Sequence, residues 1–150
     1  TASVADISKG MEKLQGQFTS ATCSIAQRAA ITALTADNAP SIEMAKEFAR
    51  RRQRVMELLK DVPGISCTKP EGAFYVFPDM SSYYGKTDDE GNVIKDSADL
   101  CMYILNTAHV SSVMGAAFGE PNCVRFSYAN SLENIEKAWT RIKVALAKLK

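Results

Sequence analysis

The chain has 150 residues, of which 46% are hydrophobic and 23% charged, and its formal net charge is +1. This size allows one domain with a real core, and the composition excludes a disordered chain, a collagen-like repeat and a coiled-coil rod. The near-neutral charge gives no reason to expect nucleic acid or an anionic membrane as a partner. Short apolar runs and an N-terminus without a basic, apolar leader predict a cytoplasmic protein without a membrane span. Because the chain does not begin with Met, we expect it to be a piece of a longer polypeptide.

Two helices are predicted in the first 40 residues. Apolar residues recur at steps of three and four from Val4 to Leu14, which is the pattern of one helix face. After a polar break, a second helix is predicted over 25–34, with Ser24 as its N-cap and with 38–40 ending it. No strand is predicted nearby to cover the apolar faces, so we expect these helices to be mobile or to pack against a second copy of the chain.

The remaining residues, 41–150, predict an α+β unit with a small mixed or antiparallel sheet and helices on one face. A long helix starts at Ser41 and is stopped by Pro63 and Gly64. The elements after it follow the order strand, strand, helix, strand, strand, helix, and their predicted ranges are 65–69, 72–77, 97–107, 110–114, 123–128 and 131–149. Asp96 or Ser97 caps the first of these helices.

Two helices carry apolar stripes that are predicted to be buried. In the helix that starts at Ser41, the stripe consists of Ile42, Ala45, Ala49, Met56 and Leu59. In the last helix, which starts at Asn130 or Ser131, it consists of Ile135, Trp139, Ile142, Leu146 and Leu149. The last stripe is too short for a coiled coil, so packing on the sheet is the stronger interpretation.

The cysteines and the single histidine do not form a metal-binding pattern. Cys23, Cys67, Cys101 and Cys123 contain no CxxC pair, and His109 is the only histidine, so we predict no metal. The thiols are expected to be reduced and mostly buried. A structural role is favoured for His109, and a functional role stays open because histidine side chains commonly act as acids, bases or ligands.

The only basic run contains four arginines between Arg50 and Arg54. At 100° per residue they spread around a helix, and Glu47 lies at the right spacing to pair with Arg50 and Arg51. This pattern predicts solvated ion pairs, so no nucleic acid is expected as a partner.

Arg125 is the strongest candidate for a binding residue. In the strand over 123–128, Arg125 and Ser127 lie on the face opposite the apolar side chains, beside a bend made flexible by Gly115 and Gly119. A guanidinium offers a two-pronged donor for a carboxylate or a phosphate. A surface arginine on a half-buried strand explains these residues equally well.

Several segments resemble a known family. M-G-A-A-F-G at 114–119 and V-R-F-S-Y-A-N-S-L-E-N-I at 124–135 resemble the C-terminal signature of class I pyridoxal-phosphate aminotransferases, above all the bacterial aspartate aminotransferases. Three further blocks, over 13–27, 70–77 and 79–85, agree with that family in the same order. The C-terminal signature and the three further blocks together make four collinear regions, and the resemblance covers essentially the whole chain.

The resemblance implies roles for individual residues. Arg125 matches the arginine that holds the substrate α-carboxylate, and Phe74 matches an aromatic position near the substrate. Thr19 and Ser20 match a stretch that approaches the active site of the other subunit in a homodimer, although the family's following proline is missing here.

The resemblance also implies a division of the chain. Residues 1–40 would be a helical remnant of the large domain that binds the cofactor, and residues 41–150 would be the C-terminal small domain of a fold-type I enzyme.

The resemblance implies pyridoxal 5'-phosphate as cofactor of the parent protein. The parent would transfer an amino group between an amino acid and a 2-oxo acid, with aspartate and 2-oxoglutarate favoured and aromatic, alanine or prephenate-type specificity left open. The family needs a Schiff-base lysine, and neither Lys9 nor Lys69 lies in a matching context. We therefore expect no catalytic residue in this chain, no covalent cofactor on it, and no activity when it is alone. The alternative is a stand-alone, non-catalytic module that binds amino acids or another protein.

Overall fold

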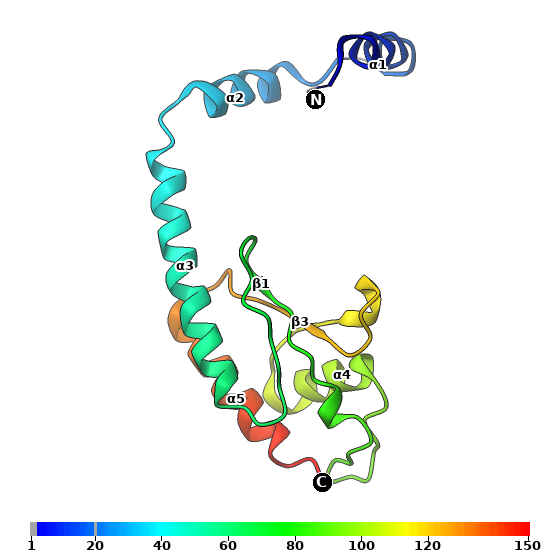
Figure 1. The fold of residues 1–150 in the computed structure, drawn as a ribbon, viewed down its shortest axis with the longest axis vertical. Coiled ribbons are helices and arrows are strands. Elements are labelled where there is room, and N and C mark those ends of the chain that lie inside the picture. Colours follow the sequence, from blue (N-terminus) through cyan, green and yellow to red (C-terminus); the bar gives the residue numbers. More distant parts are fainter. Residues whose placement is uncertain (1–2, 20) are drawn as a thin grey trace. The chain divides into compact units, whose positions relative to one another are not determined.

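The computed structural model describes residues 3–19 and 21–150. The chain divides into two compact units, Thr1–Pro40 and Ser41–Lys150. Its elements in chain order are α1 (Ala5–Phe18), α2 (Ser24–Thr35), α3 (Ala39–Lys60), β1 (Tyr75–Val76), the 3₁₀ turn η1 (Ser81–Tyr83), α4 (Ser97–Ala108), β2 (Val113–Met114), the 3₁₀ turn η2 (Gly115–Phe118), β3 (Val124–Ser127) and α5 (Leu132–Leu146) (Figure 1). None of the described helices is long and apolar enough to cross a membrane.

The Thr1–Pro40 unit contains the two helices that the apolar spacing predicts. Neither α1 nor α2 buries a single residue, and Phe18 at the end of α1 is 81% exposed. The prediction of Ser24 as N-cap is wrong: Cys23 holds that position and makes no side-chain hydrogen bond, while Ser24 already lies in the first turn. The expectation that the four thiols are mostly buried is wrong, because Cys23 is exposed and the other three cysteines are only half-buried.

The long helix α3 begins at Ala39, two residues before the predicted start at Ser41. Proline is tolerated in a first turn because its missing N–H has no partner there, so Pro40 is part of the helix. The predicted buried stripe is wrong for the N-terminal half of α3, where Ile42 is 54% exposed. Only Val55 and Leu59 are buried, where the helix enters the core.

The sheet has three strands in the order β1-β3-β2, and all its pairs are antiparallel. This settles the choice between a mixed and an antiparallel sheet. The predicted strand over 65–69 is wrong in its extent, because only Ser66 pairs, in a single bridge with Asp79. The predicted strand over 110–114 is reduced to its last two residues. These runs are shorter than predicted because strand length depends on a partner elsewhere in the chain.

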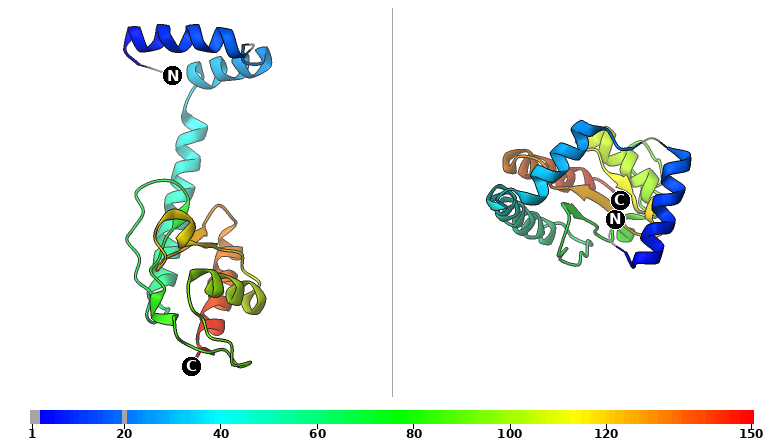
Figure 2. Two further views of the ribbon diagram at one scale, coloured as in Figure 1. Left: turned by 90° about the vertical axis from the view of Figure 1, so that its right-hand side faces the viewer. Right: turned by 90° about the horizontal axis from the view of Figure 1, so that it is seen from above.

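One face of the sheet packs on the helices. Val124, Phe126 and Tyr128 are buried while Ser127 is exposed, so the predicted alternation along β3 is confirmed. The rings of Phe126 and Trp139 lie 5.0 Å apart, which joins β3 to α5. Figure 2 shows α4 and α5 beside the strands. All five residues of the predicted stripe in the last helix are buried: Ile135, Trp139, Ile142, Leu146 and Leu149.

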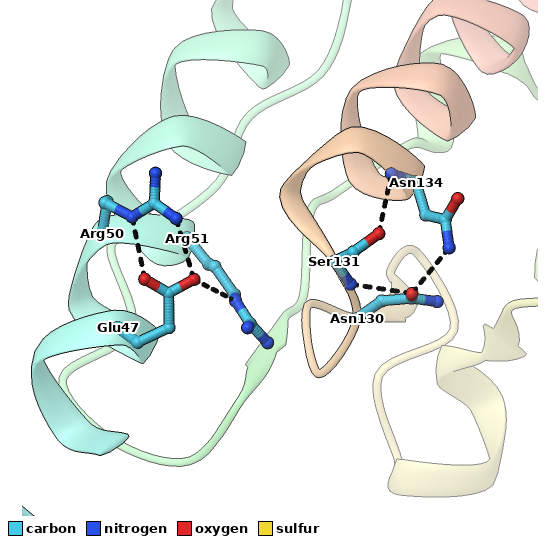
Figure 3. A network of polar contacts seen from close by, with 6 residues as sticks. All are labelled: Glu47, Arg50, Arg51, Asn130, Ser131 and Asn134. Carbon is cyan, nitrogen blue, oxygen red and sulfur yellow. Dashed lines mark hydrogen bonds and ion pairs between the residues drawn. The ribbon is translucent and has the colours of Figure 1, made fainter. Parts of the chain in front are cut away.

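Side-chain caps fix where α4 and α5 begin. Asp96, one of the two predicted caps of α4, accepts hydrogen bonds from two backbone N–H groups of its first turn. At α5, Ser131 Oγ accepts from the backbone N–H of Asn134 at 3.2 Å, and Asn130 Oδ1 accepts from Ser131 N at 2.8 Å and from Asn134 Nδ2 at 3.0 Å (Figure 3). Because only four residues separate the end of β3 from the start of α5, these bonds define the chain path that leaves the strand.

Candidate functional site

Arg125 lies on β3 and packs against two aromatic rings. Its guanidinium carbon is 4.4 Å from the ring centroid of Tyr75 and 4.4 Å from that of Phe118. Tyr75 comes from β1 and pairs with Ser127 in the sheet register, so its side chain is on the same face as Arg125. Phe118 comes from η2, after β2. Three segments separated in sequence therefore meet at this one cation.

The N–H groups of Arg125 have no partner among the described residues 3–19 and 21–150, where the side chain makes neither a hydrogen bond nor an ion pair. It differs in this from the other half-buried arginines, each of which donates to an oxygen: Arg51 to Glu47, Arg52 to the carbonyl of Pro70 and Arg54 to Glu136. A half-buried cation with free donors is suited to bind an anion from outside the chain.

Phe74 is connected to Arg125 through Tyr75. The ring centroids of Phe74 and Tyr75 are 4.5 Å apart, and those of Phe74 and Phe48 on α3 are 5.9 Å apart. Phe74 remains 37% exposed, so part of its ring is available for a ligand. Tyr75 is thus in contact with both Phe74 and Arg125, two of the residues predicted for the site.

The backbone before β1 is held by Tyr128. Its N–H donates to the carbonyl of Phe74 at 2.9 Å, and its hydroxyl donates to the carbonyl of Ala73 at 3.0 Å. Ala73 has a positive φ of 56°, which a residue other than glycine adopts rarely. Burial raises the pKa of the Tyr128 hydroxyl, so it stays protonated and can donate. These bonds orient Phe74 and Tyr75 at the start of β1.

The loop that carries Phe118 is closed by backbone hydrogen bonds. Gly115 N donates to the carbonyl of Cys123 at 2.8 Å, and Glu120 N donates to the carbonyl of Gly115 at 3.1 Å. A Cβ on Gly115 would lie 2.2 Å from each of the carbonyl oxygens of Cys123 and Glu120, so only glycine fits. Phe77 meets Phe118 edge-on, with 6.0 Å between the centroids. The glycine-rich bend that the sequence predicts to be flexible is therefore a tight, bonded loop.

Thr19 and Ser20 are the other two residues predicted for the site. Thr19 follows α1 in the Thr1–Pro40 unit, and its N–H donates to the carbonyl of Gln15 at 3.1 Å. Arg125 and Phe74 belong to the other unit, and Ser20 lies outside the described residues. The approach of Thr19 and Ser20 to another subunit's site therefore stays a prediction.

Two arginines of the basic run, Arg50 and Arg51, pair with a carboxylate of their own helix. Glu47 accepts from Arg50 Nε at 2.8 Å and from Arg51 Nε at 2.8 Å, which confirms the predicted pairs (Figure 3). Hydrogen bonds from Arg50 and then Arg51 lower the pKa of Glu47 from 4.5 to about 2. These arginines are therefore already paired, whereas Arg125 is not.

The lysines do not fit a covalent pyridoxal-phosphate site. A Schiff-base lysine is activated by desolvation or by a neighbouring cation. In the described ranges every lysine is exposed except Lys86, which is half-buried with its Nζ 5.8 Å from the ring centroid of Tyr83. That position lies in the loop before α4, apart from the site residues in sequence. The residues present therefore fit carboxylate binding and not attachment of the cofactor.

Tyr75 and Phe118 are site residues that the sequence alone does not reveal. Both lie in the segments that carry the family resemblance, but neither residue type nor spacing assigns them a role. Their contact with Arg125 depends on the antiparallel register of β1 with β3 and on the closed loop after β2.

Comparison with known proteins identifies the family. A family model described as aminotransferase class I and II matches residues 1–142. The chain is 43% identical over 141 residues to the bifunctional aspartate aminotransferase and glutamate/aspartate-prephenate aminotransferase of Petunia hybrida, covering 92% of this chain and 29% of that protein. It is 38% identical over 144 residues to an aspartate aminotransferase of Rhizobium meliloti, covering 96% and 35% of the two chains.

Solved structures agree with the sequence comparison. The crystal structure of the aspartate aminotransferase from Rhizobium meliloti matches with a TM-score of 0.88 at 39% identity, over 95% of this chain and 36% of that one. The aspartate aminotransferase of Thermotoga maritima matches with a TM-score of 0.80 at 33% identity, over 97% and 34%. The chain spans about a third of the length of these relatives. With its α+β fold and the family model matching nearly its full length, the chain belongs to the class I and II aminotransferases.

Proposed function

We propose that this chain is the substrate-binding part of a pyridoxal-phosphate-dependent aminotransferase that transfers an amino group from aspartate to 2-oxoglutarate. The observation that carries the proposal is Arg125, a half-buried cation held against Tyr75 and Phe118 with its N–H groups free. The names of the relatives, which include aspartate and aspartate-prephenate aminotransferases, support this substrate class.

In this proposal Arg125 binds the α-carboxylate of the amino acid and of the 2-oxo acid. A planar guanidinium can donate two parallel hydrogen bonds to a carboxylate, which fixes both the position and the rotation of the substrate. Holding the carboxylate orients the Cα–H bond for proton removal, and such positioning accounts for a large part of many rate enhancements. Phe74 limits the space beside the bound substrate.

The cofactor and its lysine belong to other parts of the parent polypeptide in this proposal, since the lysines described above do not fit. Residues 1–40 belong to the large cofactor domain and residues 41–150 form the small domain. In the homodimer, Thr19 and Ser20 approach the partner's active site. The chain spans about a third of its relatives and α1 and α2 bury no residue, which supports this assignment.

The first test is steady-state kinetics of the full-length enzyme with Arg125 replaced. Arg125→Ala should lower kcat/KM for aspartate by roughly 30- to 5,000-fold, because removing one partner of a hydrogen-bonded charge pair costs about 2–5 kcal/mol. Arg125→Lys should have a kcat/KM between those of wild type and Arg125→Ala, since lysine keeps the charge and loses the two-pronged geometry. Arg141→Ala, which removes an exposed arginine on α5, is the matched control and should leave kcat/KM unchanged. An unchanged kcat/KM in Arg125→Ala would overturn the proposal.

The second test separates this function from that of a stand-alone binding module. Calorimetry on the 150-residue chain with aspartate and 2-oxoglutarate should show weak binding or none, because the rest of the pocket is missing. Tight binding abolished by Arg125→Ala would favour the module instead. Added pyridoxal phosphate should give no absorbance band that borohydride abolishes, and a label on a lysine of this chain would contradict the proposed division of roles.

A further inference from the structure

We propose that Tyr75 and Phe118 are positioning residues that hold the Arg125 guanidinium in the orientation that receives the substrate carboxylate. This inference rests on the proposed function, and it assigns a task to two residues that do not themselves bind the carboxylate.

The first argument is the kind of contact that Arg125 makes. Both contacts are aromatic, at 4.4 Å from each ring centroid, and an aromatic ring attracts a guanidinium without using its N–H groups. An acidic partner would hold the side chain equally firmly but would occupy the donors that a carboxylate substrate needs. The two rings therefore fix the cation and leave its hydrogen-bonding capacity for the ligand.

The second argument is that each ring is itself held in place. Tyr75 lies in the β1–β3 ladder and packs on Phe74, with 4.5 Å between the ring centroids. Phe118 is held by the closed loop from Gly115 and by the edge of Phe77. A long, flexible arginine loses side-chain entropy when it binds, and a site that immobilises it beforehand reduces that loss.

Removing either ring is expected to weaken binding of the substrate carboxylate. In the full-length enzyme, Tyr75→Leu and Phe118→Leu should each raise KM for aspartate by roughly 2- to 30-fold, the range that a cation–π contact covers. Phe118 is 49% exposed, so its replacement should not unfold the domain. Tyr75→Phe and Phe118→Tyr keep a ring at each position and should retain nearly normal KM.

The decisive readout is coupling to Arg125. In an Arg125→Ala background the ring replacements should have no further effect on KM, because the group that they position is gone. Turnover of an amine without an α-carboxylate should also be insensitive to both ring replacements. A purely structural role would instead lower activity in every background and with every substrate.

Tyr103→Leu provides the matched control. It removes a half-buried ring on α4, whose hydroxyl donates to the carbonyl of Ala145 at 2.7 Å, so it should lower the melting temperature without changing KM. Ring variants with normal KM, in an enzyme that Arg125→Ala impairs, would overturn this inference and leave the proposed function standing. The inference would also be overturned if the ring replacements raised KM as much in the Arg125→Ala background as in the wild-type background. A normal KM in Arg125→Ala itself would overturn both.

Discussion

Side chains of one type have different tasks in this chain because their nearest partners differ. Arg50 and Arg51 share the carboxylate of Glu47, whereas Arg125 contacts only rings and keeps its donors free within the described residues. Residue type and exposure do not separate these arginines, since Arg51 and Arg125 are both half-buried. The role of each arginine is therefore set by its partner. A carboxylate occupies the N–H groups of the guanidinium, whereas an aromatic ring holds the guanidinium in position and leaves those N–H groups free.

The paired carboxylate gives a pH-dependent contribution to stability. The pKa of Glu47 is lowered by the hydrogen bonds from Arg50 and Arg51, from 4.5 to about 2. A lowered pKa means that the ionised carboxylate stabilises the fold above about pH 4.5, and that this contribution is lost as the pH falls toward 2. Glu47→Gln should therefore lower the melting temperature slightly at pH 7 and by much less near pH 2.

Thermal unfolding of wild type and Glu47→Gln between pH 2 and pH 7 would measure the effect. The pair is solvent-exposed, so added salt should shrink the difference at pH 7. Glu12→Gln, on α1 and without an ion pair among the described residues, is a suitable control. A difference between Glu47→Gln and wild type that stays constant across this pH range would contradict the proposed cause.

At the scale of elements, a short closed loop decides where Phe118 lies. The 3₁₀ turn η2 follows β2 directly, and the chain then returns to begin β3 six residues after Phe118. The backbone of Gly115 approaches the carbonyl groups of Glu120 and Cys123 too closely for any side chain. Such an approach is open to glycine alone, and it ties the turn to the strand that carries Arg125.

Gly115→Ala should therefore destabilise the domain. A methyl group 2.2 Å from two backbone oxygens cannot be accommodated without moving the loop, and overpacking of this kind costs typically about 1–3 kcal/mol. Urea unfolding of the 150-residue chain would measure the change, and KM of the full-length enzyme should rise as Phe118 moves. Gly72→Ala is the matched control, because no atom lies within 4 Å of the added methyl, and it should change stability by less than about 0.5 kcal/mol. Equal stability of the two variants would show that the loop adapts freely.

At the scale of the whole molecule, the two units differ because one has a hydrophobic core and the other has none. All nineteen buried hydrophobic residues in the described part of the chain belong to the Ser41–Lys150 unit, and α1 and α2 bury none of theirs. These helices have 14 and 12 residues, a length at which isolated helices are marginal in water. They lack tertiary burial within their own unit, which is the usual source of helix stability.

Hydrogen exchange should report this contrast directly. In the 150-residue chain, amides of α1 and α2 should exchange much faster than those of α4 and α5, unless the apolar faces pair with a second copy of the chain. Measurement at two protein concentrations, with sedimentation on the same samples, separates these cases. A monomer in which α1 and α2 exchange slowly would contradict the prediction, and the exposed apolar residues of α1 would then need another explanation.

The sequence predicts correctly those features that depend on residues close together in the chain. The last helix and its buried stripe follow from the spacing of Ile135, Trp139 and Ile142, and the alternation around Arg125 follows from β3 alone. The predictions are wrong where strand pairing or burial depends on segments that are distant in the sequence. The predicted strand over 65–69 finds a partner only at Ser66, and Ile42 stays exposed although it lies in the expected stripe.

The sequence by itself determined the family, the positions of the helices and the choice of Arg125 as the candidate for carboxylate binding. These conclusions depend on local periodicity and on collinear segments, which are properties of the chain read in order. Only the tertiary structure decided that the sheet is antiparallel and that Tyr75 and Phe118 meet at Arg125 while its donors stay free. The reason is physical: strand register brings Tyr75 to Arg125, 50 positions away in the chain, and loop closure turns Phe118 back onto the same cation, and no local pattern records either contact.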